Sequence, residues 1–248
     1  MRIHLRPQRF HLQFAHLLFL LVRKRINGIK RKAALQQQMS ELEMKALRAQ
    51  MNPHFIFNSL SSIQESIISN KTEAASKYLG KFSKLIRMVL ENSGKKFISL
   101  QDEINYLQLY LELESFRFDD LNFTISCNES DTAFIRIPPM IVQPYVENAL
   151  KHGLAHKAGE KKLSVLFYHN KKNQLTAEIT DNGIGRKQSM LINTSRTDAH
   201  QSMGMQITQQ RLSLLNEEQQ ASVEITDLSE ENGSAAGTKV TVILPTEQ

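Results

Sequence analysis

Apolar residues begin a regular spacing at residue 35, where they alternate steps of four and three positions. The series comprises Leu35, Met39, Leu42, Ala46, Ala49, Pro53, Ile56, Leu60, Ile63 and Ile67. This heptad spacing predicts a long helix that packs on a partner helix, because its apolar positions form one seam. Pro53 lies on that seam and lacks a backbone N–H, so we expect a kink there without a change of register.

A second amphipathic helix is predicted after the polar turn at 69–72. Its apolar positions are Ala75, Tyr78, Leu79, Phe82, Leu85, Ile86 and Val89, and Asn92-Ser93-Gly94 is a typical helix stop. Two antiparallel helices cannot bury both of their apolar faces alone, so we expect the hairpin to dimerise into a four-helix bundle. The alternative is a monomeric hairpin that packs on the rest of the chain.

The remainder of the chain mixes helical and strand patterns. A third helix is expected at about Leu100–Phe116, and further helices at Pro139–His152 and about Met203–Asn216. Alternation and β-branched content predict strands at Leu121–Cys127, Leu163–Tyr168, Gln174–Thr180, Ser222–Asp227 and Lys239–Leu244. This order predicts an α+β fold, a two-layer sandwich with one sheet covered by helices on one side. The polar stretch Arg186–Gln201 is expected to be a mobile loop.

These patterns divide the chain into three predicted parts. Residues 1–32 form a basic juxtamembrane segment, residues 33–95 hold the dimerisation helices, and residues 96–248 form the α+β domain. The composition, 41% hydrophobic and 23% charged, excludes a wholly disordered chain. The single cysteine, Cys127, excludes an internal disulfide or a structural zinc cluster of cysteines.

Positive charge is concentrated at the N-terminus. The net charge is +6, but residues 1–40 hold nine basic and no acidic residues, which leaves 22 basic against 25 acidic residues, or −3, for the rest. A basic arm on an acidic body suits an anionic surface such as lipid headgroups. The salt-dependent binding of nucleic acid by this arm is a rival reading, but we expect no nucleic-acid partner.

One hydrophobic stretch, Phe10–Val22, precedes three basic residues at 23–25. Its 13 residues are too few for a spanning helix, which needs about 20. It can be the inner end of a longer spanning segment, an interfacial helix or a buried helix. Basic residues after a hydrophobic stretch predict that the rest of the chain lies at the cytoplasmic face of the cell membrane.

The first segment that could take part in a reaction is Asn52-Pro53-His54-Phe55-Ile56-Phe57-Asn58. His54 lies one step off the apolar seam, so its imidazole is predicted to reach solvent beside the core. A neutral imidazole nitrogen can attack phosphorus directly. Phe55 rather than a carboxylate follows His54, so an acid or base that assists it must come from elsewhere, and Glu103 and Glu147 are candidates.

The second segment runs from Pro138 to Gly153 (PPMIVQPYVENALKHG). On a helical wheel, Gln143, Glu147 and Lys151 lie opposite the apolar half, and Asn148 and His152 lie at its border. An Asn oxygen at the edge of a buried face can hold a hydrated Mg²⁺. His152 and His156 have metal-ligand spacing, but Gly153 is expected to break the helix between them, so zinc is not expected.

Two glycine-containing segments follow. Asp181-Asn182-Gly183-Ile184-Gly185 ends a predicted strand, where an Asp can accept a hydrogen bond from an exocyclic amine such as that of adenine. Ser202-Met203-Gly204-Met205 leads into a helix that carries Arg211, and Gly237-Thr238 precedes the last strand. A glycine at a helix N-terminus suits an anion.

In this order, the four segments resemble those of LytS-like (LytS/YehU-type) sensor histidine kinases, whose catalytic portion has the ATPase fold of gyrase, Hsp90 and MutL proteins. The resemblance covers about Glu41 to Pro245 and rests on N-P-H-F-x-F-N, Q-P-x-x-E-N-A-x-x-H-G and D-N-G-x-G. It implies a homodimeric two-component kinase that uses ATP and Mg²⁺. The chain departs from the family at Ser202, where a glycine is usual.

The resemblance also implies residue roles. His54 corresponds to the phosphoacceptor, Asn148 to the Mg²⁺ ligand and Asp181 to the residue that binds adenine. The other positions expected to bind nucleotide are His152, Gly183, Gly185, Gly204, Arg211, Gly237 and Thr238, with 186–201 as the ATP lid. The phosphoryl group would then pass to an Asp of a response regulator with a receiver domain. The alternatives are a nucleotide-binding regulatory dimer without autokinase activity and an ATP hydrolase of the same fold.

Overall fold

The computed structural model describes residues 23–28, 30, 53–118, 120–193, 222–229 and 235–247. The chain divides into two compact units, residues 1–45 and 46–248. In the first unit, residues 23–28 are helical. Among the described residues, every helix is too short or too polar to cross a membrane. The fold that follows is that of the second unit.

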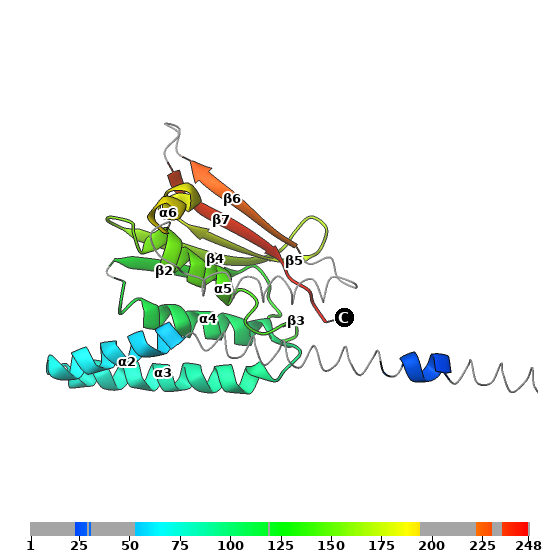
Figure 1. Cartoon of the computed structure of the whole chain (residues 1–248), viewed down its shortest axis with the longest axis horizontal. Helices are drawn as coiled ribbons and strands as arrows, with labels where there is room; N and C mark the ends of the chain where they lie inside the picture. Colours follow the sequence, from blue (N-terminus) through cyan, green and yellow to red (C-terminus); the bar gives the residue numbers. More distant parts are fainter. Residues whose placement is uncertain are drawn as a thin grey trace, which may run out of the picture. The chain divides into compact units, whose positions relative to one another are not determined.

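Two helices open this unit and lie side by side as a hairpin (Figure 1). They are α2 (Pro53–Ile68) and α3 (Thr72–Ser93), joined by a turn in which Asn70 has a positive φ of 55°. Phe55 and Ile63 of α2 are buried, whereas Leu60 and Ile67 are 48% and 56% exposed. The predicted hairpin is confirmed from Pro53 onward; residues 35–52, and with them any kink at Pro53, lie outside the described residues.

A third helix, α4 (Leu100–Glu114), lies between the hairpin and the sheet (Figure 1). Ser99 caps it, because the Ser99 hydroxyl accepts a hydrogen bond of 3.0 Å from the Asp102 amide. Two aromatic rings tie α4 to α2: the centroids of Phe55 and Tyr110 are 5.2 Å apart. The helix is buried along most of its length, so it forms the packed centre of the unit.

One five-stranded sheet completes the unit, in the order β2-β4-β5-β7-β6. Its strands are β2 (Leu121–Cys127), β4 (Lys161–His169), β5 (Leu175–Asp181), β6 (Ser222–Ser229) and β7 (Ala235–Ile243). β2 runs parallel to β4, and the other pairs are antiparallel. A small second sheet pairs β1 (Ile98–Ser99) with β3 (Arg136–Ile137), two strands too short to show alternation in the sequence.

Three helical pieces cover one face of the sheet together with α4. α5 (Gln143–Asn148) continues into a π-helix, Ala149–Leu154, and α6 (Gly185–Asn193) follows β5 (Figure 1). Apolar side chains of alternating strand positions, such as Leu163, Val165 and Phe167, are buried beneath them. The predicted α+β sandwich with helices on one side is confirmed, whereas the bundle dimer stays a prediction. The predicted division at 32 and 95 is likewise untested.

Three local predictions were wrong. The helix predicted from Pro139 begins at Gln143, because Met140 has a positive φ of 55° and interrupts the helical backbone. Gly153 does not break the helix, since it lies inside the π-helical turns. The predicted loop at 186–201 is helical up to Asn193, and residues 194–201 lie outside the described part.

Candidate functional site

The centre of the candidate site is Asp181, the last residue of β5. Its side chain is buried, with 4% of the residue exposed, and Oδ1 accepts a hydrogen bond of 2.8 Å from the Gly183 amide. Burial raises the pKa of the carboxyl to about 6, and hydrogen bonds from the Gly183 and Thr238 backbones and the charge of Lys157 oppose that rise. A buried carboxylate with unused acceptor capacity can receive a hydrogen bond from an amine.

Two glycines close around Asp181. A Cβ on Gly153 would lie 2.6 Å from Asp181 Oδ1, and a Cβ on Gly183 would lie 2.4 Å from the Gly153 backbone. The Ile184 amide donates to the Gly153 carbonyl at 3.1 Å, which fixes the two segments together. Only residues without a side chain allow this approach. The π-helix at 149–154 thus places Gly153 next to the end of β5. Short π-helical segments are frequent at functional sites.

The neighbouring strand β7 also packs closely against Asp181. Thr238 of β7 pairs in register with Asp181, and a Cβ on Gly237 would lie 1.8 Å from the Asp181 carbonyl oxygen. Gly237 also has a φ of 126°, which side chains rarely permit. The predicted residues Asp181, Gly183, Gly237 and Thr238 are therefore together in the structure. Gly185, with a φ of 76°, begins α6 beside them.

Asn148 ends α5 and precedes the π-helix. Its Nδ2 atom is buried and has no hydrogen-bond partner in the described part of the chain. The unpaired Nδ2 is a hydrogen-bond donor, so it fits an acceptor such as a phosphate oxygen or a bound water, whereas a metal would be met by the Oδ1 atom. Among the described residues no cluster of three or more His, Cys, Asp or Glu could hold a metal. A single Asn oxygen supplies one metal ligand, so water and phosphate oxygens would supply the others. Such a coordination shell suits Mg²⁺ better than an ion that is held by protein ligands alone.

Other predicted residues differ in what the structure shows of them. His152 is half-buried in the π-helix, one turn after Asn148. His54 lies in the first turn of α2, and its side chain is outside the description, as are Gly204 and Arg211 altogether. The wheel placed Gln143 on the polar side, which was wrong, since only 4% of it is exposed.

The two carboxylates considered as partners of His54 have distinct environments. Glu103 is fully buried and accepts hydrogen bonds from the amides of Met140 and Val142, so it is unavailable as a base. Glu147 is half-buried; its Oε1 accepts a hydrogen bond of 2.7 Å from Gln143, and its Oε2 lies 3.7 Å from Lys151 Nζ. Of the two candidates, Glu147 remains.

Sequence reasoning missed two contributions to the site. Gly153 closes the second motif directly after His152, but the sequence predicts no role for it other than that of a helix breaker. Asn182 joins the ends of β4 and β5: its Oδ1 accepts a hydrogen bond of 2.8 Å from the Lys162 amide, and its Nδ2 donates to the Glu160 carbonyl. No pattern in the sequence reports that contact.

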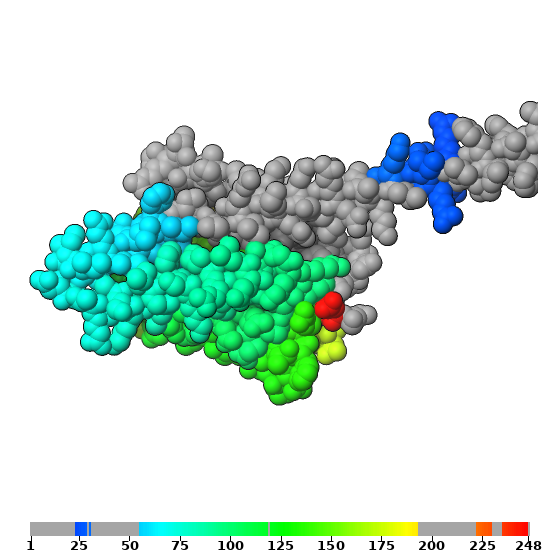
Figure 2. Space-filling view, turned by 90° about the horizontal axis from the view of Figure 1, so that it is seen from below, coloured from blue at the N-terminus to red at the C-terminus, as the bar shows by residue number. Residues whose placement is uncertain are grey.

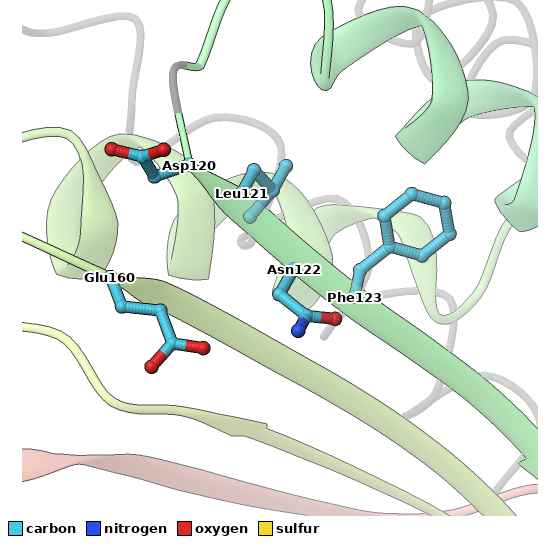
Figure 3. A pocket seen from close by; sticks show the side chains of 5 residues that line it. All are labelled: Asp120, Leu121, Asn122, Phe123 and Glu160. Atoms are coloured by element: carbon cyan, nitrogen blue, oxygen red, sulfur yellow. The ribbon is translucent and has the colours of Figure 1, made fainter.

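A shallow hollow of about 500 Å³ lies elsewhere, at the start of β2 (Figure 3). It is lined by Asp120, Leu121, Asn122, Phe123 and Glu160. None of the predicted site residues lines it, and its two carboxylates would repel a phosphate. The hollow is therefore not the candidate nucleotide site.

Comparison with known protein families shows which family the chain belongs to. Residues 42–122 match the family described as "Histidine kinase", and residues 138–248 match "Histidine kinase-, DNA gyrase B-, and HSP90-like ATPase". The chain belongs to the histidine kinase family. The resemblance proposed from the motifs is thereby confirmed, and the histidine kinase-type ATPase region includes Asn148, Asp181 and the glycines around them.

Individual relatives agree with this assignment. The chain is 36% identical to "Sensor protein LytS" of Staphylococcus haemolyticus over 148 residues, 59% of this chain and 25% of that protein. It is 29% identical to "Sensor protein LytS" of Oceanobacillus iheyensis over 232 residues, 91% of this chain and 38% of that protein. The chain thus spans well under half the length of these two curated relatives.

A solved structure is also similar to the chain. The histidine kinase domain from Erythrobacter litoralis EL346 blue-light activated histidine kinase aligns with a TM-score of 0.42 and 16% identity, covering 83% of this chain and 95% of that one.

Proposed function

We propose that this histidine kinase chain transfers the γ-phosphoryl group of ATP to its own His54 and then to an aspartate of a response regulator. The observation that carries the proposal is the burial of Asp181 between Gly153 and Gly183, in the region that matches the histidine kinase-type ATPases. A buried carboxylate acceptor flanked by closely packed glycines is suited to the exocyclic amine of adenine. The LytS relatives are named as sensor proteins, which supports a role in signalling.

The nucleotide would be held by residues of three segments. Asp181 accepts the adenine amine, Gly183, Gly185 and Gly237 let the segments around it pack closely, and Thr238 supports Asp181 from β7. His152, Gly204 and Arg211 complete the proposed set of nucleotide contacts. The amide oxygen of Asn148 would face Mg²⁺, which neutralises phosphate charge when it is bound.

The proposed transfer forms one bond and breaks one. A neutral nitrogen of His54 donates its lone pair to the γ-phosphorus, while the bond from that phosphorus to the bridging oxygen breaks and ADP leaves with the electron pair. Glu147 is the carboxylate candidate for taking the second ring proton. In the later step, an aspartate oxygen of the regulator replaces the His54 nitrogen on phosphorus.

The hairpin is the proposed dimer surface. Large apolar side chains on α2 and α3 remain exposed in the single chain, namely Phe57, Leu60, Ile67, Ile68, Leu79 and Leu90. Figure 2 shows that the two helices form one elongated surface, drawn in cyan. Exposed apolar positions along a helix pair favour association with a second copy into a four-helix bundle.

The N-terminal segment is proposed to bring the kinase portion to the cytoplasmic face of the cell membrane. The support is the sequence: Phe10–Val22 is apolar, and nine basic residues without an acidic one occupy residues 1–40. Deletion of residues 1–32 is expected to lower the membrane-bound fraction of the protein. An unchanged membrane fraction would contradict this anchoring role.

The deciding experiment is incubation of the purified protein with γ-labelled ATP and Mg²⁺. We expect acid-labile, base-stable label on the wild type and its loss in His54→Ala and Asn148→Ala. His156→Ala is the matched control, because His156 is an exposed histidine outside the proposed transfer step. Nucleotide binding without any label would contradict the kinase reaction and favour a regulatory dimer, and ATP turnover by His54→Ala would favour a hydrolase.

A further inference from the structure

The start of α5 is held by a carboxylate from another helix. Glu103, in the first turn of α4, is 0% exposed. Its Oε2 accepts a hydrogen bond of 2.9 Å from the Met140 amide, and its Oε1 accepts one of 3.4 Å from the Val142 amide. In the chain, Glu103 is separated from Met140 by 37 positions and from Val142 by 39. Glu103 is therefore part of the structure of the turn that precedes α5.

That turn needs an external partner. Met140 has a φ of 55°, a left-handed conformation that is strained for a residue with a side chain. The first amides of a helix have no acceptor within the helix, and the residue before α5, Val142, has no side chain that can accept. Residues 140–142 are buried, so water cannot supply the bonds. The carboxylate of Glu103 does so and also places negative charge at the positive end of α5.

The helix that Glu103 holds is short and carries Asn148. It spans Gln143–Asn148, so the residue that Glu103 bonds, Val142, lies about 9 Å from Asn148 at 1.5 Å per residue. The other end is fixed where Gly153 meets Asp181. With both ends fixed, the buried amide of Asn148 has one position, whereas release of the first end would let α5 shift as a unit.

We infer that Glu103 is a positioning residue for the metal: through the 140–142 turn it holds Asn148 where the Asn148 amide meets the Mg²⁺ of the bound nucleotide. The inference rests on the proposed function. Glu103 does not touch the nucleotide itself, and it acts only through α5. Residues that orient a metal ligand typically contribute 10-fold to 100-fold to metal affinity.

The test is the affinity for ATP measured by calorimetry, once with Mg²⁺ and once with EDTA. In Glu103→Gln the size is kept, but an amide NH₂ replaces one acceptor and faces a backbone N–H. We expect the Mg²⁺-dependent gain in affinity to fall by about tenfold, while the affinity in EDTA changes by less than about twofold because Asp181 is unaltered. A merely structural role would lower both affinities together.

Glu112→Gln is the matched control. Glu112 lies on the same helix, and its partners are Lys81 of the hairpin at 2.7 Å and Gln108 of its own helix at 3.0 Å. This variant loses the same charge and is expected to keep the Mg²⁺-dependent gain. A Glu103→Gln protein with a wild-type circular dichroism spectrum and an undiminished gain would overturn the inference.

A measurement on the wild type applies even if Glu103→Gln does not fold. Hydrogen exchange at the Met140 and Val142 amides is expected to be slower with ATP and Mg²⁺ than with ATP in EDTA, because a ligand on Asn148 steadies α5. Equal exchange rates would overturn the inference. A wild-type protein whose ATP affinity gains nothing from Mg²⁺ would instead overturn the proposed function, and the role of Glu103 with it.

Discussion

Gly153 and Asp181 lie in direct contact, so close that a Cβ on Gly153 would be 2.6 Å from the Asp181 Oδ1 atom. Gly153 comes from the π-helix that follows Asn148, and Asp181 ends β5. The contact joins the segment proposed to meet the metal to the residue proposed to meet adenine. A side chain at position 153 must therefore change the site and not only the stability of the fold.

Gly153→Ala is expected to weaken ATP binding by at least about tenfold, because a 2.6 Å contact forces the Asp181 carboxylate or the π-helix to move. The free energy of unfolding should fall by about 1–3 kcal/mol, the usual cost of overpacking. Calorimetry with ATP and urea unfolding measure the two quantities.

Gly80→Ala is the control for that substitution. A Cβ on Gly80 meets nothing within 4 Å, and Gly80 lies inside α3. Alanine should raise the free energy of unfolding by about 0.5–1 kcal/mol and leave ATP binding unchanged. If Gly153→Ala bound ATP as well as Gly80→Ala does, the close contact would have no part in the site.

The pKa of Asp181 predicts a pH dependence of stability. Burial raises this pKa to about 6 from the ordinary 3.8, so the folded protein binds the proton more tightly than the unfolded chain. The stabilisation is fully present below about pH 3.8 and is lost as the pH rises through about 6, with a total of about 3 kcal/mol.

Asp181→Asn removes that titration, so its stability relative to the wild type should increase as the pH rises from 4 to 7. Urea unfolding at several pH values measures this difference, and ATP binding should be lost in the same variant. A difference in stability that does not vary with pH would contradict the raised pKa.

The elements that could be predicted are those with a local pattern. Strict alternation from Leu121 to Cys127 predicted the strand that became β2 with the same bounds. The helix α6 was missed because Met190, Leu191 and Ile192 are exposed, so their spacing marks no buried face. Periodicity reports burial, and an element without a buried stripe gives no such signal.

The sequence predicts many residues of the candidate site, but it does not predict the contacts between them. The motifs identified Asp181, Gly183 and Asn148, but no local rule shows that Gly153 meets a residue 28 positions later. The start of α5 was misplaced for the same reason, since a carboxylate 37 residues away supports the turn at Met140. Contacts of this kind are decided by packing between distant segments.

Arg186 and Asp227 form a paired contact that joins α6 to β6, with nitrogen–oxygen distances of 2.7 and 2.9 Å. Both side chains are well exposed, so the pair should contribute less than about 1 kcal/mol. A double-mutant cycle of Arg186→Gln and Asp227→Asn measures the coupling, which should shrink as salt is added. A coupling that stayed constant up to 1 M salt would contradict a screened surface pair.

Glu114 and Arg117 form a second ion pair. Because Glu114 is buried, we expect the loss of its partner to cost much more stability than at the exposed pair. The Glu114 side chain is 5% exposed, and both of its oxygens accept hydrogen bonds from Arg117, at 3.0 and 2.8 Å. Burial raises the pKa of Glu114, and the charge of Arg117 opposes the rise. Arg117→Met leaves a buried carboxylate without its partner, which should cost about 3 kcal/mol at neutral pH.

The pH dependence of Arg117→Met separates lost charge from lost packing. Without Arg117 the pKa of Glu114 rises further, so the stability that the protonated form retains is lost as the pH rises through that raised pKa. The double variant Glu114→Gln, Arg117→Met holds no carboxylate and should recover most of the stability at pH 8. Urea unfolding measures each variant, and a deficit in Arg117→Met that is equal at pH 5 and pH 8 would show that the arginine acts by packing alone.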